Sequence, residues 1–216
     1  AGGLDLGFKM AGHDIIWAND LYGDAVETYR LNLGDHIVCE DISKINENDV
    51  PDCDIIIGGF PCQGFSVANT KRHEGDERNA LYKQLIRIIN AKKPKFFLAE
   101  NVKGLTNLAK GKVFQMILSD FSELGYVVKY KILNAADYGV PQTRQRVIIV
   151  GVRNDVDFEY DFPQATHSKD GKDGLPKWVS VSEAMAPIPD PDSPNNMMNH
   201  EYSKYKLNFN GYLGHR

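Results

Sequence analysis

The stretch CDIIIGGFPCQGFS at residues 53–66 decides the fold class and marks a candidate site. It begins as a continuous apolar run that ends at two glycines, which is typical of a strand buried on both faces of a sheet. It then continues through a turn that exposes Cys62 between Pro61 and Gln63. A thiolate at such a strand end is a capable nucleophile if its surroundings lower its pKa. A loop cysteine on its own is more often inert.

Alternating strand and helix patterns surround this stretch. Strands are predicted at residues 15–19, 37–39, 53–59, 95–100, 126–133 and 146–152, and helices at 24–33, 79–89 and 113–124. Asn79 is a candidate cap of the second helix. The apolar face expected for the third helix consists of Val113, Ile117, Phe121 and Leu124. Strands separated by helices predict an α/β fold with a largely parallel sheet and helices on both faces.

The composition is that of an ordinary globular protein. Hydrophobic residues make up 42% and charged residues 25% of the 216 positions. No apolar run approaches the roughly 20 residues of a membrane-spanning helix, and no secretory signal is visible. We therefore expect a cytoplasmic protein, associated with the nucleoid if it is bacterial, without a membrane partner. The net charge of −4 argues mildly against a nucleic-acid partner. A basic cleft can still lie on an acidic body.

The ends of the chain and its cysteines add further expectations. The first residues, AGGLDLGF, lack a Met and suggest a fragment, and beyond residue 153 the alternation decays into polar (167–176) and proline-rich (186–194) segments. This tail predicts loops or the start of a second domain. Cys39, Cys53 and Cys62 show no C-x-x-C spacing and are odd in number. They therefore predict neither a metal site nor a disulfide framework, and they favour a reducing intracellular setting.

Polar side chains follow two further strands of the predicted sheet. Glu100 comes at the end of the strand at 95–100, while Arg144 and Arg146 share one face as the last strand begins. A lone carboxylate is more often a helix cap or salt-bridge partner, and paired arginines often form surface ion pairs. Arginines also suit bidentate recognition of phosphates or base edges. Because ligands bind at the carboxyl ends of strands, we expect Cys62, Glu100 and both arginines to converge on one rim.

Three motifs carry a family resemblance. They are Pro61-Cys62-Gln63, Glu100-Asn101-Val102 and the segment 142–146, which reads QTRQR. With these motifs in this order, residues 1 to about 152 resemble the DNA cytosine-5 methyltransferases. The resemblance implies a Rossmann-like S-adenosylmethionine-dependent methyltransferase fold for the catalytic domain at 1–152. It further implies that 153–216 is a loop-rich extension that begins an incomplete target-recognition region.

The resemblance also implies a mechanism. Cys62 is expected to attack carbon-6 of a cytosine in double-stranded DNA, and Glu100 to hold the edge at ring nitrogen 3. Arg144 and Arg146 orient the base and support developing negative charge, while the methyl group moves to carbon-5. A stacked base must first be flipped out, at a cost of a few kcal/mol. The polar segment 64–79 is a hypothetical mobile loop that closes over the DNA. Further contacts to the substrate or loop are implied for Gln63, Ser66 and Asn101.

The implied cofactor is S-adenosylmethionine. In the family a glycine-rich loop, an acidic residue after the second strand and a pair after the third strand surround it. Taken singly, the aspartates at these places are more often helix caps. The corresponding cofactor positions here are Ala1, Gly3, Asn19, Asp20, Leu21, Asp41, Ile42, Gly59, Pro61 and Leu81.

Three alternatives remain open. The first is the RNA-directed branch of the same family, which methylates cytosine in transfer RNA. The second is a non-catalytic DNA-binding paralogue or subunit, which the retention of Cys62, Glu100 and the arginines argues against. The third, a nicotinamide-dependent oxidoreductase, requires a G-x-G-x-x-G motif that is not visible. A complementary subunit or a missing C-terminal region is a further candidate partner. The family resemblance also suggests a restriction-modification system as the biological setting.

Overall fold

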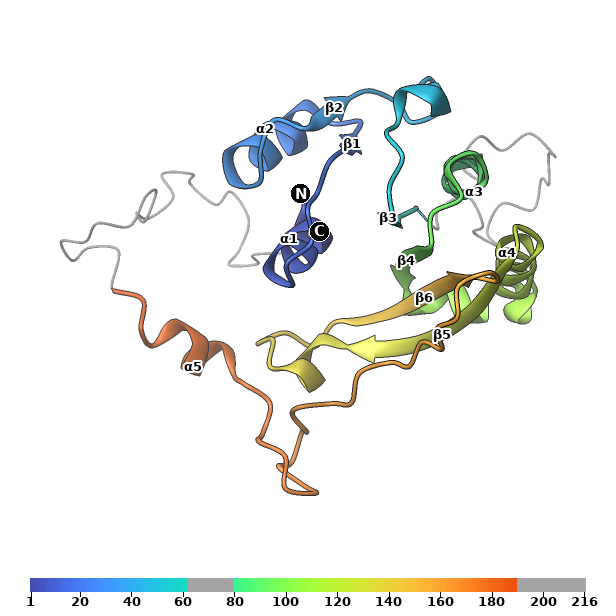
Figure 1. Ribbon diagram of the computed structural model, residues 1–216. Coiled ribbons are helices and arrows are strands. Elements are labelled where there is room, and N and C mark those ends of the chain that lie inside the picture. Colours follow the sequence, from blue (N-terminus) through green and yellow to red (C-terminus); the bar gives the residue numbers. More distant parts are fainter. Residues whose placement is uncertain (62–79, 190–216) are drawn as a thin grey trace.

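The computed structural model describes residues 1–61 and 80–189 (Figure 1). The strands are β1 (Ala18–Asp20), β2 (Ile37–Cys39), β3 (Ile55–Gly59), β4 (Phe96–Val102), β5 (Tyr126–Asn134) and β6 (Gln145–Arg153). The α-helices are α1 (Gly3–Met10), α2 (Gly23–Asn32), α3 (Ala80–Lys92), α4 (Lys112–Glu123) and α5 (Val181–Met185). Short 3-10 segments are η1 (Glu47–Asp49), η4 (Lys103–Gly111) and η5 (Ala135–Tyr138). Over these described ranges, no helix has the length and apolar character needed to cross a membrane.

The strands form two sheets with a mixed pairing pattern. β1 and β2 pair in parallel, and the larger sheet has the order β3-β4-β6-β5. In the larger sheet β3 and β4 are parallel, but β6 runs antiparallel to both β4 and β5. The α/β class is confirmed, while the largely parallel pairing predicted for the sheet is wrong for β5 and β6. The short connection at 135–144 holds no crossover helix, so β6 returns beside β5 in the opposite direction.

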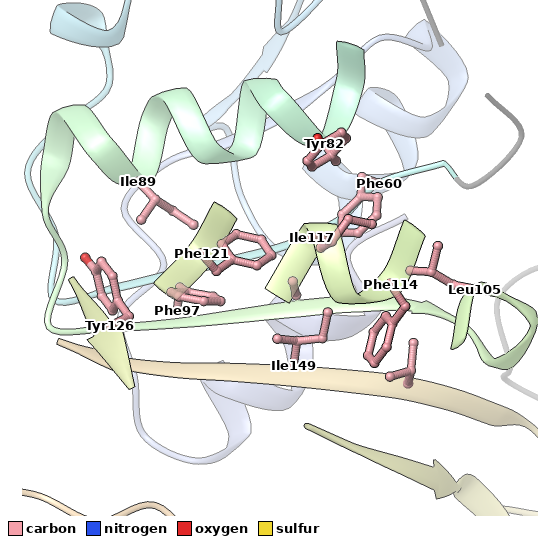
Figure 2. Packing of buried hydrophobic residues seen from close by; sticks show 12 residues of the cluster. Phe60, Tyr82, Ile89, Phe97, Leu105, Phe114, Ile117, Phe121, Tyr126 and Ile149 are labelled. Carbon is pink, nitrogen blue, oxygen red and sulfur yellow. The ribbon is translucent and has the colours of Figure 1, made fainter. Parts of the chain in front are cut away.

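Helices flank the strands on both sides, as predicted. In Figure 1, α2 is drawn to the left of β1 and β2 and α1 below β1, while α3 and α4 lie to the right of β3 and β4. The main core fills the space between α3, α4 and one face of β4 and β6 (Figure 2). At its centre Phe97 stacks on Phe121 with ring centroids 4.6 Å apart and meets the Tyr126 ring edge-on at 5.2 Å. Full burial of each such side chain contributes about 1.5–3 kcal/mol.

The buried face of α4 differs from the predicted one. Phe114, Ile117 and Phe121 are fully buried in the core, whereas Val113 and Leu124 are only partly buried beside it. Phe114 meets the Tyr130 ring of β5 edge-on at 4.7 Å. The buried face of the helix therefore includes Phe114, next to β5, and has Val113 at its border.

A second, smaller core joins α2 to the β1-β2 sheet. It consists of Val26, Tyr29, Leu33 and Ile37, with Ala18 packed against it. The start of α1 packs here too, since a Cβ atom at Gly2 would lie 2.4 Å from Leu33 Cδ1. Gly2 also has a φ of +79°, which glycine adopts without strain. Gly2 thus lets the start of α1 pack closely against α2.

The strand at the centre of the opening stretch is less buried than predicted. β3 begins at Ile55 instead of residue 53, and its isoleucines are only partly buried. β3 pairs with β4 on one side, and on the other side it lines a large cavity. β1 likewise begins at Ala18, later than the predicted residue 15, and lines the same cavity. The predicted cap Asn79 lies outside the described residues.

The segment after β6 has little regular structure up to residue 189. Its main element is α5, which starts with a capping box in which Ser180 and Glu183 exchange hydrogen bonds. The segment is anchored on η5, because the backbone N–H groups of Thr166 and His167 both donate to Asp137 O at 2.9 Å. Trp178 Nε1 donates to Asp137 Oδ1, also at 2.9 Å. This loop-rich extension is therefore attached to the connection that leads into β6.

Candidate active site

The ends of three strands meet at one rim of the larger sheet. The carboxyl ends of β3 and β4 lie side by side, with Gly59 opposite Glu100. β6 starts at the same rim because it runs antiparallel to β4, which places Arg146 opposite Val102. The reversed direction of β6 therefore explains how residues at the start of one strand join residues at the end of two others.

Glu100 forms ion pairs with both predicted arginines. Its Oε1 lies 2.9 Å from Arg146 Nε and 3.4 Å from Arg144 Nη2. The side chains of Glu100 and Arg146 are 22% and 26% exposed, while that of Arg144 is 48% exposed. Partly exposed pairs of this kind contribute at most about 1 kcal/mol to stability. The cluster is thus a small contributor to folding, and it carries one more positive than negative group.

Asn101 holds the backbone directly after β3. Its side chain is only 2% exposed. Nδ2 donates to Phe60 O at 2.7 Å, and Oδ1 accepts from the Val102 N–H at 2.8 Å. Asn101 was predicted to contact the substrate or the loop. In the structure it is buried, and its side chain binds the backbone just before Pro61.

Several predicted residues fall in a segment that is not described. Cys62, Gln63 and Ser66 lie outside the described residues, as does the polar segment 64–79. Pro61 is described and is exposed. The predicted convergence of the thiol with the other groups is therefore untested, whereas Glu100, Arg144 and Arg146 do come together.

A cavity of about 1140 Å³ opens beside this rim. It lies between the edges of β1 and β3, and it is larger than the roughly 300–1,000 Å³ typical of small-molecule sites. Eight of the predicted catalytic and cofactor positions line it, namely Ala1, Gly3, Asn19, Asp20, Ile42, Gly59, Glu100 and Arg144. The remaining described positions, which are not in its lining, are Leu21, Asp41, Pro61, Leu81, Asn101 and Arg146.

The cavity wall also contains residues that the sequence reasoning missed. They are mostly apolar and include Phe8, Trp17, Ile55, Ile57 and Ile88. The sequence pattern does not indicate that these residues line a cavity. Isoleucines have the same spacing in a strand buried on both faces and in a strand that borders a cavity. Trp17, directly before β1, is the one whose size could have drawn attention.

The amide and carboxylate groups of the last two residues of β1 already form local hydrogen bonds. Asn19 Nδ2 donates to Val38 O at 3.2 Å and to Glu40 O at 2.8 Å, which ties β1 to the end of β2. Asp20 Oδ1 accepts from the Tyr22 N–H at 3.0 Å. The predicted cofactor role of the Asn19 side chain thus competes with a structural one, because its amide donates to two backbone carbonyls.

The loop after β2 is held in place by α3. Arg87 Nη2 donates to Ile42 O and Ile45 O, both at 2.9 Å, and Nη1 pairs with Glu47. At the start of this loop, hydrogen bonds from the Ser43 N–H and hydroxyl hold the pKa of the Asp41 carboxyl below its ordinary value. Asp41 is therefore a charged turn residue, while Ile42 lines the cavity.

The residues around the cavity fit an adenosyl cofactor. Glycines form one wall at the start of α1, and Asp20 supplies a carboxylate that can accept from ribose hydroxyls. Ile42 and Trp17 offer apolar surface for an adenine ring. Over the described ranges, no group of three or more His, Cys, Asp or Glu is arranged to hold a metal ion.

The fold class follows from similarity to solved structures. A crystal structure assigned to a DNA modification methyltransferase of an Escherichia coli prophage is 30% identical to this chain, with a TM-score of 0.69 over 87% of this chain and 52% of that one. The Schizosaccharomyces pombe Dnmt2 methyltransferase shares the fold, with a TM-score of 0.62 at 24% identity over 74% of this chain and 50% of that one. The fold is therefore the Rossmann-like methyltransferase fold.

The family follows from the sequence. Residues 1–211 match the family model described as C-5 cytosine-specific DNA methylase, and the chain belongs to this family. It is 49% identical to the Type II methyltransferase M.NgoFVII of Neisseria gonorrhoeae, over 91% of this chain and 53% of that protein. It is 42% identical to the Type II methyltransferase M.BspRI of Lysinibacillus sphaericus, over 87% and 50%. The predicted resemblance is confirmed, and the chain spans about half the length of the curated relatives it matches.

Proposed function

We propose that the protein transfers a methyl group from S-adenosylmethionine to carbon-5 of a cytosine flipped out of double-stranded DNA. The observation that carries this proposal is the cluster of Glu100, Arg144 and Arg146 at the rim where β3 leads into Pro61 and Cys62. Membership of the C-5 cytosine-specific DNA methylase family supports it.

The cofactor would bind in the cavity beside the rim. When bound, S-adenosylmethionine supplies an electrophilic methyl group. Asp20 would accept hydrogen bonds from the ribose hydroxyls, and the glycines at the start of α1 would let the backbone approach the ligand closely. Ile42 would contact the adenine, in a loop that Arg87 holds by two backbone carbonyls. Leu21, Asp41, Pro61 and Leu81 stay predictions as cofactor contacts.

Cys62 would act as the nucleophile. Its thiolate adds to carbon-6 of cytosine, and the electron pair of the carbon-5–carbon-6 double bond makes carbon-5 nucleophilic. After carbon-5 has gained the methyl group, it loses its proton to a base, the double bond re-forms and the thiolate leaves. No oxidant or reductant is needed, and the sulfur ends as it began.

Glu100 and the arginines would handle the charge that develops on the ring. The Glu100 carboxyl would hold the edge at ring nitrogen 3, where a hydrogen bond or proton stabilises the intermediate. Arg144 and Arg146, which both contact Glu100 Oε1, would keep this carboxyl in one orientation. Their excess positive charge also suits an anionic nucleic acid.

We propose the following division of the chain and biological setting. Residues 1–152 form the catalytic domain, and 153–216 begin the target-recognition region, which is attached through Asp137 as described above. The relatives named Type II methyltransferases support a role in a restriction-modification system.

Trapping with 5-fluorocytosine tests the proposed nucleophile. Fluorine at carbon-5 cannot leave as a proton does, so the covalent intermediate should persist. The complete gene product is incubated with labelled S-adenosylmethionine and DNA that carries 5-fluorocytosine at target positions. We expect a DNA–protein complex that survives denaturation, forms equally with Cys39→Ser and is absent with Cys62→Ser. Cys39 is an exposed free cysteine and therefore a matched control. Equal trapping by Cys62→Ser would refute the assignment.

A further inference from the structure

Two polar side chains are buried in the part of the chain that the structure describes. They are Asn101, 2% exposed, and Asn134, 7% exposed. A buried amide is costly unless its donors and acceptors find partners. Both asparagines find partners in the backbone beside the rim, and neither lines the cavity.

Asn101 uses its amide donor on the end of β3. Nδ2 donates to Phe60 O at 2.7 Å, across a sequence separation of 41 residues. The Phe60 ring is itself buried and lies 6.1 Å from that of Tyr82 in α3. The carbonyl and the ring of Phe60 are therefore both held, which fixes the backbone as it enters Pro61.

The side-chain oxygen of Asn134 accepts a hydrogen bond from the backbone of Arg144, the first of the two arginines. Oδ1 accepts from the Arg144 N–H at 3.1 Å, and the neighbouring Ala135 N–H donates to Arg144 O at 3.0 Å. Both backbone polar groups of Arg144 are thus held at the end of β5. Because the Arg144 side chain is half-exposed, its position relative to Glu100 depends on where these two hydrogen bonds hold the Arg144 backbone.

We infer that Asn101 and Asn134 are positioning residues for the methyl-transfer site, acting through Phe60 and Arg144 respectively. This inference rests on the proposed function. The two asparagines work through opposite ends of the amide, because Asn101 donates to the rim and Asn134 accepts from it. A shift of about 1 Å in reacting groups can cost about 100-fold in rate, so such anchors matter for turnover without touching substrate.

The opposite polarity allows a matched test. Aspartate is close in size to asparagine, keeps an acceptor and, when ionised, has no donor. When the introduced carboxyl is ionised, Asn101→Asp loses the hydrogen bond to Phe60 O, whereas Asn134→Asp can still accept from the Arg144 N–H. Leucine, also of similar size, removes both functions at either position. A purely structural role predicts a different order, because a buried charge should then make Asp the worse substitution at both positions.

The experiment uses four variants of the complete gene product, Asn101→Asp, Asn101→Leu, Asn134→Asp and Asn134→Leu. The single-turnover methylation rate, the DNA KM, the S-adenosylmethionine Kd and the melting temperature are measured for each. We expect the rate to fall about 100-fold in both Asn101 variants and about tenfold or more in Asn134→Leu, with Kd and KM within about threefold. Asn134→Asp should stay within about threefold of the unmodified protein.

Three outcomes would overturn the inference or its basis. Wild-type rates in Asn101→Leu or in Asn134→Leu would remove the positioning role of that residue. Rate losses that follow melting temperature across all four variants, with Asp worst at both positions, would show structural roles only. If Asn101→Leu does not fold, a normal rate in Asn101→Asp still overturns the role of Asn101, and an Asn134→Asp rate as low as that of Asn101→Asp overturns the role of the Asn134 acceptor. An unmodified protein that neither methylates cytosine nor traps 5-fluorocytosine DNA would refute the proposed function itself.

Discussion

At the scale of single residues, the proposed chemistry depends on one carboxylate that forms ion pairs with two guanidiniums. Glu100 Oε1 lies within 3.4 Å of both Arg144 and Arg146, on a rim built from three strand ends. The pairing leaves the Glu100 carboxyl only 22% exposed, so it is pre-oriented before any base arrives. Pre-oriented charges cost little reorganisation during a reaction, which is why such groups contribute to catalysis.

Replacement of this carboxylate tests its role. Glu100→Gln keeps the size and one acceptor but removes the charge and the exchangeable proton, so the methylation rate should fall about 100-fold or more. The free energy of unfolding should change by less than about 1 kcal/mol, because partly exposed ion pairs contribute little. Glu159→Gln, which alters an exposed pair with Lys129, is the matched control and should leave the rate unchanged. An unimpaired Glu100→Gln enzyme would remove Glu100 from the mechanism.

The sequence predicted the rim residues but not what holds them. Glu100 and the arginines stand out because each is a charged group beside an apolar strand. The anchors Asn101 and Asn134 act through hydrogen bonds to backbone far away in sequence or across a loop. Residue type alone does not indicate such bonds, so the motif suggested a substrate or loop contact for Asn101 and nothing for Asn134.

At the scale of elements, strand and helix positions followed largely from the sequence, and pairing direction did not. Residues 37–39 form β2 as predicted, and α4 covers the predicted helix to within a residue. β6 pairs antiparallel to β5 because the connection at 135–144 is too short for a crossover helix. The sequence shows that this connection is a loop, but it does not show in which direction β6 runs. The partial burial of β3 depends on the cavity beside it, which a single strand pattern cannot show.

The packing of β6 on β4 depends on one glycine. A Cβ atom at Gly151 would lie 1.9 Å from Phe97 Cε1, in the centre of the main core. Gly151→Ala should therefore destabilise the fold by about 1–3 kcal/mol through overpacking. Thermal and urea unfolding measure this, with Gly104→Ala as the control, because a Cβ atom there would meet nothing within 4 Å. Equal stability of the two variants would contradict the close approach of the Phe97 ring to Gly151.

At the scale of the whole molecule, two sheets share one cavity beside one rim. The β1-β2 pair contributes Asn19 and Asp20 to it, and the larger sheet contributes Gly59 and Glu100. This arrangement places the proposed cofactor site next to the proposed site of the cytosine. Transfer of a methyl group between two bound molecules requires them to lie side by side. The cavity forms only when both sheets are assembled. The sequence could therefore predict individual residues of the cavity lining, but it could not predict that residues of the two sheets line the same cavity.

The central claim is that Cys62 forms the bond to cytosine, and peptide mapping tests it most directly. The complete gene product is trapped on 5-fluorocytosine DNA and digested with trypsin and nuclease, and the nucleotide-linked peptide is sequenced by mass spectrometry. We predict that the modified pyrimidine is attached to the sulfur of Cys62. Attachment to Cys39 or Cys53, or methylation of ordinary DNA with no linked peptide at all, would contradict the account.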